Sequence, residues 1–396
     1  MIGVEKLIGL EDFIVEEIIE EDNKIIFSGH LKRKEQICPR CNNRVREVKD
    51  TRTQLIKDVP AFGKNVFIKL KKQRYICRKC NKSFYEENKF LKKYQRTTDR
   101  VLGKIFTMSA EVNSFSFISK ELNIPITTLI RKFDLIEYPK SNLENVEVLA
   151  IDEFKGNTGG EKYNCIIADP KRKIILDILP KRYKIDLQNY FFKIDKGVRD
   201  KIKIFISDMW QTYFDVAKDK LKNSKFVVDK YHWIRQVIWA FENVRKQEQK
   251  KFYKEYRKYF KRSKSLLTKR FEFLKDDEKA QVNVMLYKSE NIRLAHMLKE
   301  DFLKILECNN RIKAKKKLTE WIMYAQGSRL KSFEKCATTM INWSMGILNS
   351  FDTKYTNGYI EGCNNKIKVL KRNAYGYRNF KRFRNRILHI FNYLKV

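Results

Sequence analysis

The chain has 396 residues, with 85 Lys and Arg against 48 Asp and Glu, so its formal net charge is +37 at pH 7. With 43% hydrophobic residues, 14 Gly and 6 Pro, the composition excludes disordered, collagen-like and small disulfide-rich proteins, and the length allows two or three domains. So much like charge repels itself, which indicates a polyanionic partner: nucleic acid first, and an anionic membrane surface second.

The membrane alternative is weak. No run of the sequence approaches the roughly 18 apolar residues of a spanning helix. The first residues, MIGVEKLIGLEDF, carry acids and lack the basic start and apolar run of a signal peptide. We therefore expect no membrane partner and a cytoplasmic, nucleoid-associated bacterial protein. In that reducing compartment, paired cysteines indicate a metal site rather than disulfides.

Two Cys-x-x-Cys pairs follow a predicted β-hairpin near the start of the chain. The hairpin is formed by the β-prone residues 13–19 and 24–31 around a polar turn. The pairs are then Cys38 with Cys41 and Cys77 with Cys80, separated by a β-rich stretch at residues 65–70. Four thiolates on two tight turns suit one tetrahedral Zn²⁺, and a site closed by four protein ligands is structural. Two unrelated buried pairs, or a redox pair, are the alternatives.

Residues 98–137 are predicted to be helical, with a helix-turn-helix at residues 116–133. Pro125 suits the start of the second helix, because its missing N–H is not needed there. The spacing predicts that four residues pack inward: Ile126, Leu129, Ile130 and Phe133. It predicts that four others face the major groove of DNA: Thr127, Thr128, Arg131 and Lys132. An ordinary helical hairpin is the alternative.

Three acidic residues stand out in this basic chain. Asp152 lies in an apolar run at residues 146–154, and Asp208 lies in a second such run at residues 202–209. Glu361 is the last acidic residue of the chain and begins a basic helix. Carboxylates near the ends of core strands are costly to bury unless they are paired or bind a cation. Hard oxygen ligands favour Mg²⁺ or Mn²⁺, and a pair of such ions supports phosphoryl transfer. Alternatively, strand-end Asp residues act as caps or turn formers.

The elements between these acids predict a particular core. Residues 163–179 form a hairpin with a turn at Asp169 and Pro170, residues 184–195 are helical, and residues 227–232 run from a fifth strand into a helix. The order of three strands, a helix and further strands is that of a ribonuclease H-like core. Residues 230–345 contain very few helix breakers and are predicted to be mainly helical.

These motifs, in this order, resemble those of the DDE transposases of the ISL3 insertion-sequence family. The resemblance rests on the two Cys pairs, the Ala150-Ile-Asp-Glu-Phe154 and Ser207-Asp-Met209 strands, and the C-terminal Thr356-Asn-Gly-Tyr-Ile-Glu-Gly-Cys-Asn-Asn block. It implies that Asp152, Asp208 and Glu361 are the catalytic, Mg²⁺-binding triad. Asp229 and His232 match an Asp-x-x-His signature, either in a direct role or in capping and packing near the site.

The resemblance implies an α+β multidomain protein. Its expected parts are a zinc-ribbon DNA-binding domain at 1–95, a helix-turn-helix at 96–140, and a ribonuclease H-like catalytic domain at 141–396 that is interrupted by an all-helical insertion at about 240–345. The expected function is binding of terminal inverted repeats, metal-dependent cleavage and transfer of the 3′-hydroxyl ends to target DNA. The protein is then expected to act on double-stranded DNA as a homodimer or a higher synaptic assembly.

The stretch after Glu361 has no acidic residue, which predicts contact with DNA phosphates or, alternatively, a solvated basic face. The expected contacts are Lys371, Arg372, Arg378, Lys381, Arg382 and Arg384, with Tyr375 and Tyr377 for stacking. Two other functions remain open at this point: a non-catalytic sequence-specific DNA-binding protein, and a stand-alone metal-dependent nuclease on the same fold.

Overall fold

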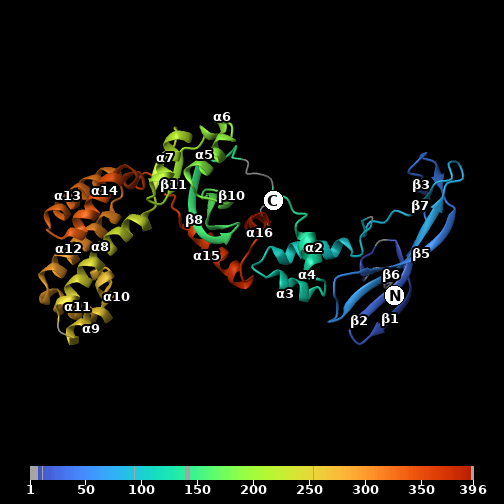
Figure 1. Ribbon diagram of the computed structural model, residues 1–396, viewed down its shortest axis with the longest axis horizontal. Helices are drawn as coiled ribbons and strands as arrows, with labels where there is room; N and C mark the ends of the chain where they lie inside the picture. Colours follow the sequence, from blue (N-terminus) through green and yellow to red (C-terminus); the bar gives the residue numbers. More distant parts are fainter. Residues whose placement is uncertain (1–7, 11, 93, 139–142, 253, 394–396) are drawn as a thin grey trace. The chain divides into compact units, whose positions relative to one another are not determined.

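The computed structural model describes residues 8–10, 12–92, 94–138, 143–252 and 254–393, and these form two compact units (Figure 1). The first unit contains the described residues up to Tyr138 together with 367–377 and 381–393. The second contains the described residues from Leu143 to Lys366 together with 378–380. The predicted boundary between residues 140 and 141 lies outside the described residues. Residues 367–377 and 381–393 are thus grouped with the N-terminal part of the chain.

The first unit begins with a mixed β-sheet. Its strands are β1 (Phe13–Glu21), β2 (Lys24–Leu31), β5 (Val48–Lys57), β6 (Asn65–Ile76) and β7 (Ser83–Tyr85). The order is β1-β2-β6-β5, with β7 also paired to β6, and only β2 and β6 run parallel. The predicted hairpin of the first two strands is confirmed. The short strands β3 (Gln36–Ile37) and β4 (Arg44–Val45) form a separate hairpin that holds the first Cys pair at its turn.

The first unit also contains helices. They are α2 (Asp99–Ser109), α3 (Phe115–Glu121), α4 (Ile126–Phe133) and α16 (Phe380–Asn392). The helix α3 begins after Ser114, whose hydroxyl accepts from the N–H of Phe117, and it is separated from α4 by a turn in which Asn123 has a φ of 46°. Asn tolerates this left-handed conformation better than most residues, which explains its place in the turn.

Two predicted orientations on α4 are wrong. Lys132 is buried, and its Nζ lies 3.3 Å from Oε1 of Gln95, so it does not face outward. Ile126 does not pack inward, because its side chain is 38% exposed in the first turn of the helix. Leu129 and Phe133 are buried as expected.

The second unit contains a five-stranded sheet of β8 (Val148–Thr158), β9 (Glu161–Asp169), β10 (Ile174–Leu179), β11 (Ile204–Ser207) and β12 (Lys225–Val228). The order is β10-β9-β8-β11-β12; β8, β9 and β10 pair antiparallel, whereas β8, β11 and β12 run parallel. The connecting helices are α5 (Lys184–Phe192), α6 (Lys196–Arg199) and α7 (Gln211–Lys220). Buried apolar residues of α5 and α7 share one hydrophobic core with this sheet.

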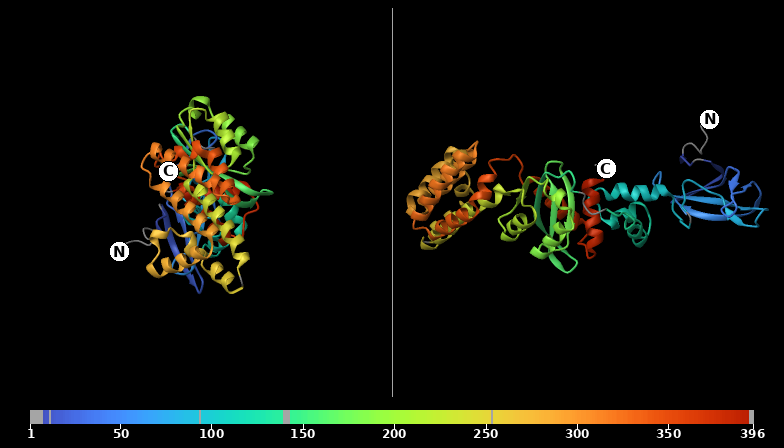
Figure 2. Two further views of the ribbon diagram at one scale, coloured as in Figure 1. Left: turned by 90° about the vertical axis from the view of Figure 1, so that its left-hand side faces the viewer. Right: turned by 90° about the horizontal axis from the view of Figure 1, so that it is seen from above.

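A bundle of helices follows β12, and Figure 2 shows it gathered beside the sheet of the same unit. Its elements are α8 (Lys230–Lys251), α9 (Lys254–Arg262), α10 (Lys264–Thr268), η1 (Phe271–Phe273), α11 (Asp276–Lys288), α12 (Glu290–Leu303), η2 (Lys304–Glu307), α13 (Arg311–Gly327) and α14 (Lys331–Asn349). The predicted helical character of this region is confirmed. The bundle packs on the sheet through α14, where a Cβ on Gly346 would lie 2.7 Å from Cγ2 of Val228. Only glycine permits such a close approach.

The last helices belong to both units. Residues 358–366 of α15 (Gly358–Asn373) lie in the second unit and the remainder in the first. The predicted break between the two C-terminal helices is confirmed at residues 374–379. Within the described residues, no helix combines the length and apolar character needed to cross a membrane.

Candidate functional site

Three aspartates form a row across the parallel strands of the second unit. Ala150 of β8 pairs with Ile206 of β11; two residues later come Asp152, still within β8, and Asp208, the residue directly after β11. Ser207 pairs with Val228 of β12, so the next pair in the same register is Asp208 and Asp229. The N–H of Asp229 donates to the carbonyl of Ser207 at 2.9 Å, which continues this ladder. Neighbouring strands lie about 4.8 Å apart, so the row brings the carboxylates together at the ends of β11 and β12.

Asp152 is held by two hydrogen bonds. Its Oδ1 accepts from the N–H of Glu153 at 2.7 Å, and its Oδ2 accepts from Nδ2 of Asn364 at 2.9 Å. Asn364 lies on α15, three residues after Glu361. Residues three apart on a helix share a face, so the contact of Asn364 with Asp152 also turns the face that carries Glu361 toward the row. The exposed side chain of Glu361 remains available to a ligand.

Asp229 positions the start of α15, the helix that carries Glu361. Although it precedes α8 at the cap position, its side chain makes no cap hydrogen bond there. Its Oδ1 instead accepts from the N–H of Asn357 at 3.2 Å, and the carbonyl of Asn357 accepts from the N–H of Glu361 at 3.0 Å. The end of β12 and the first turn of α15 are therefore tied together through Asp229.

Burial and mutual repulsion shape the electrostatics of the row. Burial raises the pKa of Asp152 to about 7, and the charges of Glu153 and Asp229 act in the same direction. Burial likewise raises the pKa of Asp208 to about 7, with Glu153 and Asp152 adding to the effect. Ionising two carboxylates in one desolvated site costs free energy, so the protonated forms are favoured. A bound cation reverses this by favouring the ionised forms.

His232 lies in the first turn of α8. Burial lowers the pKa of its imidazole, whereas the charges of Asp229, Glu153 and Glu361 act in the opposite direction. Glu361 is therefore within electrostatic reach of this end of the sheet, although it lies more than 120 residues later in the chain.

The site has the donor chemistry of a divalent-cation site. Oδ1 of Asp208 is buried and has no hydrogen-bond partner among the described residues. Such an atom is costly unless it binds a cation, and oxygen donors from Asp and Glu suit Mg²⁺ or Mn²⁺. The carboxylates are less tightly gathered than the cysteines, since the cysteines are the one metal-competent cluster within 4.8 Å in the described part of the chain. The donor set therefore suits a divalent cation, but Asp152, Asp208 and Glu361 do not form a cluster of that kind.

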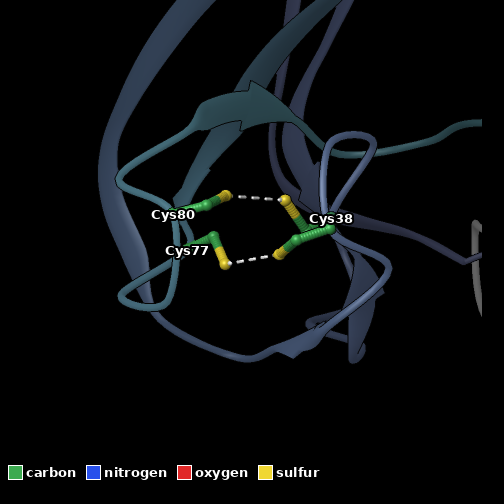
Figure 3. A group of neighbouring side chains, drawn as sticks. Cys38, Cys77 and Cys80 are labelled. Atoms are coloured by element: carbon green, nitrogen blue, oxygen red, sulfur yellow. Dashed lines mark hydrogen bonds between the residues drawn. The ribbon is translucent and has the colours of Figure 1, made fainter.

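The four predicted cysteines do converge, as Figure 3 shows for Cys38, Cys77 and Cys80. The Sγ atoms of Cys38 and Cys80 are 3.5 Å apart, as are those of Cys41 and Cys77, and all four lie within 4.8 Å. Ligands about 2.3 Å from a tetrahedral zinc are about 3.8 Å from one another, so the cluster fits a structural Zn²⁺.

The two halves of the cluster have the same backbone design. The residue after each pair, Asn42 or Asn81, has a left-handed φ of 53° or 56°, and its N–H donates to the carbonyl of Cys38 or Cys77. Burial tends to raise the pKa of the Cys38 thiol, but the N–H groups of Arg40 and Cys41 lower it to about 6. The turn thus favours the metal-binding thiolate form at Cys38, whereas burial raises the pKa of the Cys80 thiol to about 12.

The residues predicted to contact DNA differ in their solvent exposure. Six side chains are exposed or half-buried at the surface: Thr127, Thr128, Arg131, Lys371, Arg372 and Arg378. Tyr375 is fully exposed. Arg382 is half-buried and forms a bidentate ion pair with Asp134 at 2.7 and 2.9 Å, so a phosphate would have to compete with that carboxylate. Tyr377 is not available for stacking, because it is buried with its ring against Phe383 at 4.7 Å.

Sequence reasoning missed the residues that support the carboxylates. Asn364 and Asn357 both lie in the C-terminal block that carries Glu361, and their position one turn from it was the available signal. Arg182, which pairs with Glu153 and packs over the Trp210 ring at 4.8 Å, had no local signal at all.

Comparison with known proteins identifies the family. The profile of the ISL3 family, described as a transposase, matches residues 149–387, and a second profile, described as the zinc-finger of transposase IS204/IS1001/IS1096/IS1165, matches residues 34–80. The chain belongs to the ISL3 family of transposases. The match to the transposase profile contains all three predicted catalytic residues, and the match to the zinc-finger profile contains the four cysteines.

Two curated relatives are similar to this ISL3-family chain. A protein named transposase for insertion sequence element IS1001, from Bordetella parapertussis, is 24% identical over 392 residues, which cover 96% of this chain and 95% of the relative. A protein of Lactococcus lactis subsp. lactis named ATP-dependent protease is 36% identical over 109 residues, which cover 27% of this chain and 33% of that protein. The first relative matches along almost its whole length, whereas the second matches over a third and supports no functional inference.

Proposed function

We propose that this chain binds the terminal inverted repeats of an insertion sequence, cleaves the DNA at their ends, and transfers the resulting 3′-hydroxyl groups to target DNA. The observation that carries the proposal is the row of Asp152, Asp208 and Asp229, to which hydrogen bonds from Asn364 and Asn357 tie the first turns of α15, the helix that carries Glu361. The strand order β10-β9-β8-β11-β12, with the acids on neighbouring parallel strands, supports a ribonuclease H-like core.

In the proposed mechanism, Asp152, Asp208 and Glu361 would hold one or two Mg²⁺ or Mn²⁺ ions. When bound, such ions lower the pKa of an attacking water and stabilise charge on the phosphate. Asn364 fixes the orientation of Asp152 by its hydrogen bond to Oδ2, which leaves the remaining lone pairs of that carboxylate for a cation. Asp229 fixes the loop before Glu361 and thereby limits the positions that Glu361 can take.

DNA binding is assigned to the surface residues of the first unit and of the C-terminal stretch. We propose that α3 and α4 form a helix-turn-helix in which Thr127, Thr128 and Arg131 contact the repeat. We propose that the basic residues after Glu361 contact phosphates: Lys371, Arg372, Arg378 and Arg382. Tyr375 is placed to stack on a base. Because two ends must be joined in one reaction, a homodimer or larger assembly is expected on DNA.

The test uses the full chain, Mg²⁺, and duplexes that carry the inverted repeats flanking the gene. We expect Asp152→Asn, Asp208→Asn and Glu361→Gln each to lower the cleavage rate by about a thousandfold or more, because each removes a ligand of an ion that stabilises the transition state by several kcal/mol. DNA affinity measured in the absence of divalent ions should stay within a few-fold of wild type.

Two matched variants control for the loss of charge. Asp219→Asn on α7 and Glu320→Gln on α13 change exposed acids of the same unit away from the row, and both should cleave at the wild-type rate. Full cleavage by any one of the three site variants would remove that residue from the catalytic set. Cleavage without joining would identify a nuclease, and repeat binding without cleavage would identify a DNA-binding protein.

A further inference from the structure

A basic groove runs between α8 and α14 in the helical bundle. It encloses about 540 Å³, and Figure 1 shows the two helices side by side. Four exposed lysines line it, two from each helix: Lys246, Lys250, Lys331 and Lys335. The remaining lining residues are neutral, so the groove carries four positive charges and no carboxylate among the described residues.

The acidic residues of α8 do not neutralise the positive charge of these lysines. Glu242 is buried and pairs with Arg245 and, at 3.5 Å, with Lys264. Glu248 is also buried, accepts from Ser289 at 2.9 Å, and pairs with Lys251. Each of these carboxylates is thus engaged elsewhere in the bundle. Glu334, in the first turn of α14, does not line the groove.

The arrangement costs stability unless an anion occupies it. Lys246 with Lys250, and Lys331 with Lys335, are like-charged pairs four residues apart, and each pair slightly destabilises its helix. The two pairs also face one groove, which adds repulsion between the helices. A bundle surface that only needed hydration would intersperse acids with these lysines, so the pattern indicates an anionic occupant.

Neutral groups of the groove suit a phosphate backbone as well. Gln236, Asn243 and Gln247 present amide donors from α8, and amides and lysines are common partners of DNA phosphates. Trp239 is 47% exposed in the same groove, and the guanidinium of Arg235 lies 4.2 Å from its ring centroid. Arg235 therefore extends the positive surface along α8 toward the start of that helix.

We propose that the groove between α8 and α14 binds the phosphate backbone of duplex DNA that extends from the cleaved bond. The proposal rests on the function proposed above, because it takes the DNA at the carboxylate row as its starting point. The helix α8 leads directly from Asp229 into the groove, and Lys246 is 17 residues further along it. At about 1.5 Å per residue this is about 26 Å, which equals about eight base pairs at about 3.4 Å each.

The first test measures the affinity of the full chain for a labelled 40-base-pair duplex of arbitrary sequence at several salt concentrations. The variant changes all four groove lysines to Gln. Its control changes four exposed lysines of α13 to Gln and so alters the net charge equally: Lys313, Lys315, Lys316 and Lys317. Each lost phosphate contact lowers the slope of log affinity against log salt by about 0.9.

We therefore expect the slope to fall by about 3 to 4 for the groove variant and by less than about 1 for the control. Equal changes in the two variants, or an unchanged slope in the groove variant, would overturn the proposal. A wild-type chain that binds no DNA at all would instead refute the proposed function.

A second pair of variants tests the groove without removing any lysine. Thr339 lines the groove, whereas the neighbouring Thr338 is exposed outside it. Thr339→Glu should weaken binding of the same 40-base-pair duplex at least tenfold relative to Thr338→Glu, because only the first places a carboxylate beside the phosphates. Equal affinities of the two variants contradict the proposal.

The third test uses cleavage substrates whose duplex is shortened on one side of the cut bond. We expect the groove variant to cleave more slowly than wild type on long substrates and equally fast once one arm is shorter than about eight base pairs. A defect that persists on both shortened substrates would place the contact elsewhere. Wild-type cleavage in the same assay keeps this outcome distinct from a failure of the proposed function.

Discussion

Replacing Arg386 with methionine tests how the C-terminal helix holds the helices of the first unit. Arg386 lies on α16 with its side chain fully buried. Its guanidinium donates to the carbonyls of Ser109, Glu111 and Asn113, the last two at 2.9 and 2.6 Å, all between the end of α2 and the start of α3. Ser109 is the last residue of α2, and Glu111 and Asn113 lie in the connection to α3, so helix hydrogen bonds do not satisfy these carbonyls and Arg386 does.

The magnitude follows from these contacts. A hydrogen bond to a charged group contributes about 1.5–3 kcal/mol, and each buried carbonyl left without a donor costs about 1–3 kcal/mol. Methionine has a similar length and keeps the packing between the rings of Phe115 and Phe133, which lie 5.2 and 5.7 Å from the guanidinium carbon. Removing the buried charge recovers part of its desolvation cost, so we expect a net loss of about 3–5 kcal/mol.

Hydrogen exchange is the suitable assay, because a chain with two units need not unfold in one step. A loss of about 4 kcal/mol raises the exchange rates of the most protected amides in α2, α3, α4 and α16 by about a thousandfold. Amides of the second unit should be unaffected. The control is Lys381→Met on the same helix, where the ion pair with Glu137 is exposed on both sides and contributes at most about 1 kcal/mol.

Two results would refute this reasoning. One is unchanged protection of α2 to α4 in Arg386→Met, which would mean that the three carbonyls find other donors at no cost. The other is an equal effect of Lys381→Met, which would mean that general charge, rather than the buried contacts, determines the stability of this unit.

Three further predictions concern the other parts of the chain. Asp229→Ala should lower the cleavage rate about tenfold, because the hydrogen bond that anchors Asn357 is lost. Asp229→Asn still accepts that bond and should cleave within about threefold of the wild-type rate. If the Asn variant is as slow as the Ala variant, the charge of Asp229 matters instead of the hydrogen bond. Cys38→Ser should reduce the zinc content measured by mass spectrometry and weaken protection of the sheet around it, with Cys308→Ser as the control that leaves both intact. Burial lowers the pKa of His296 from its ordinary 6.5 to about 4, so the folded state disfavours its protonation. The free energy of unfolding of the bundle should therefore fall by up to about 3 kcal/mol as the pH drops from 6.5 to 4. In denaturant titrations, His296→Phe should remove that dependence.

The sequence by itself determined the features that depend on local pattern. Each Cys-x-x-Cys turn is specified by a few neighbouring residues, so the metal-binding cluster could be predicted from spacing alone. The apolar runs before Asp152 and Asp208 likewise specified buried strands, because the alternation and length of such runs are set locally; Asp208 directly follows β11, whereas β8 continues past Asp152 to Thr158. Parallel pairing of neighbouring strands then made it reasonable to expect the two acids together.

Only the tertiary structure decided which side chains are exposed to bind a ligand and which are engaged in contacts within the fold. Lys132 has the helical position of an outward residue, but Gln95 covers it from another part of the chain. Asn364 reaches Asp152 across 212 residues, and Arg386 reaches the end of α2 across 277. Such contacts depend on which elements pack together, and that choice is made by the summed burial of many apolar residues rather than by the local pattern around any one of them. The same packing aligns two lysine pairs from distant helices in one groove, which neither helix reveals alone.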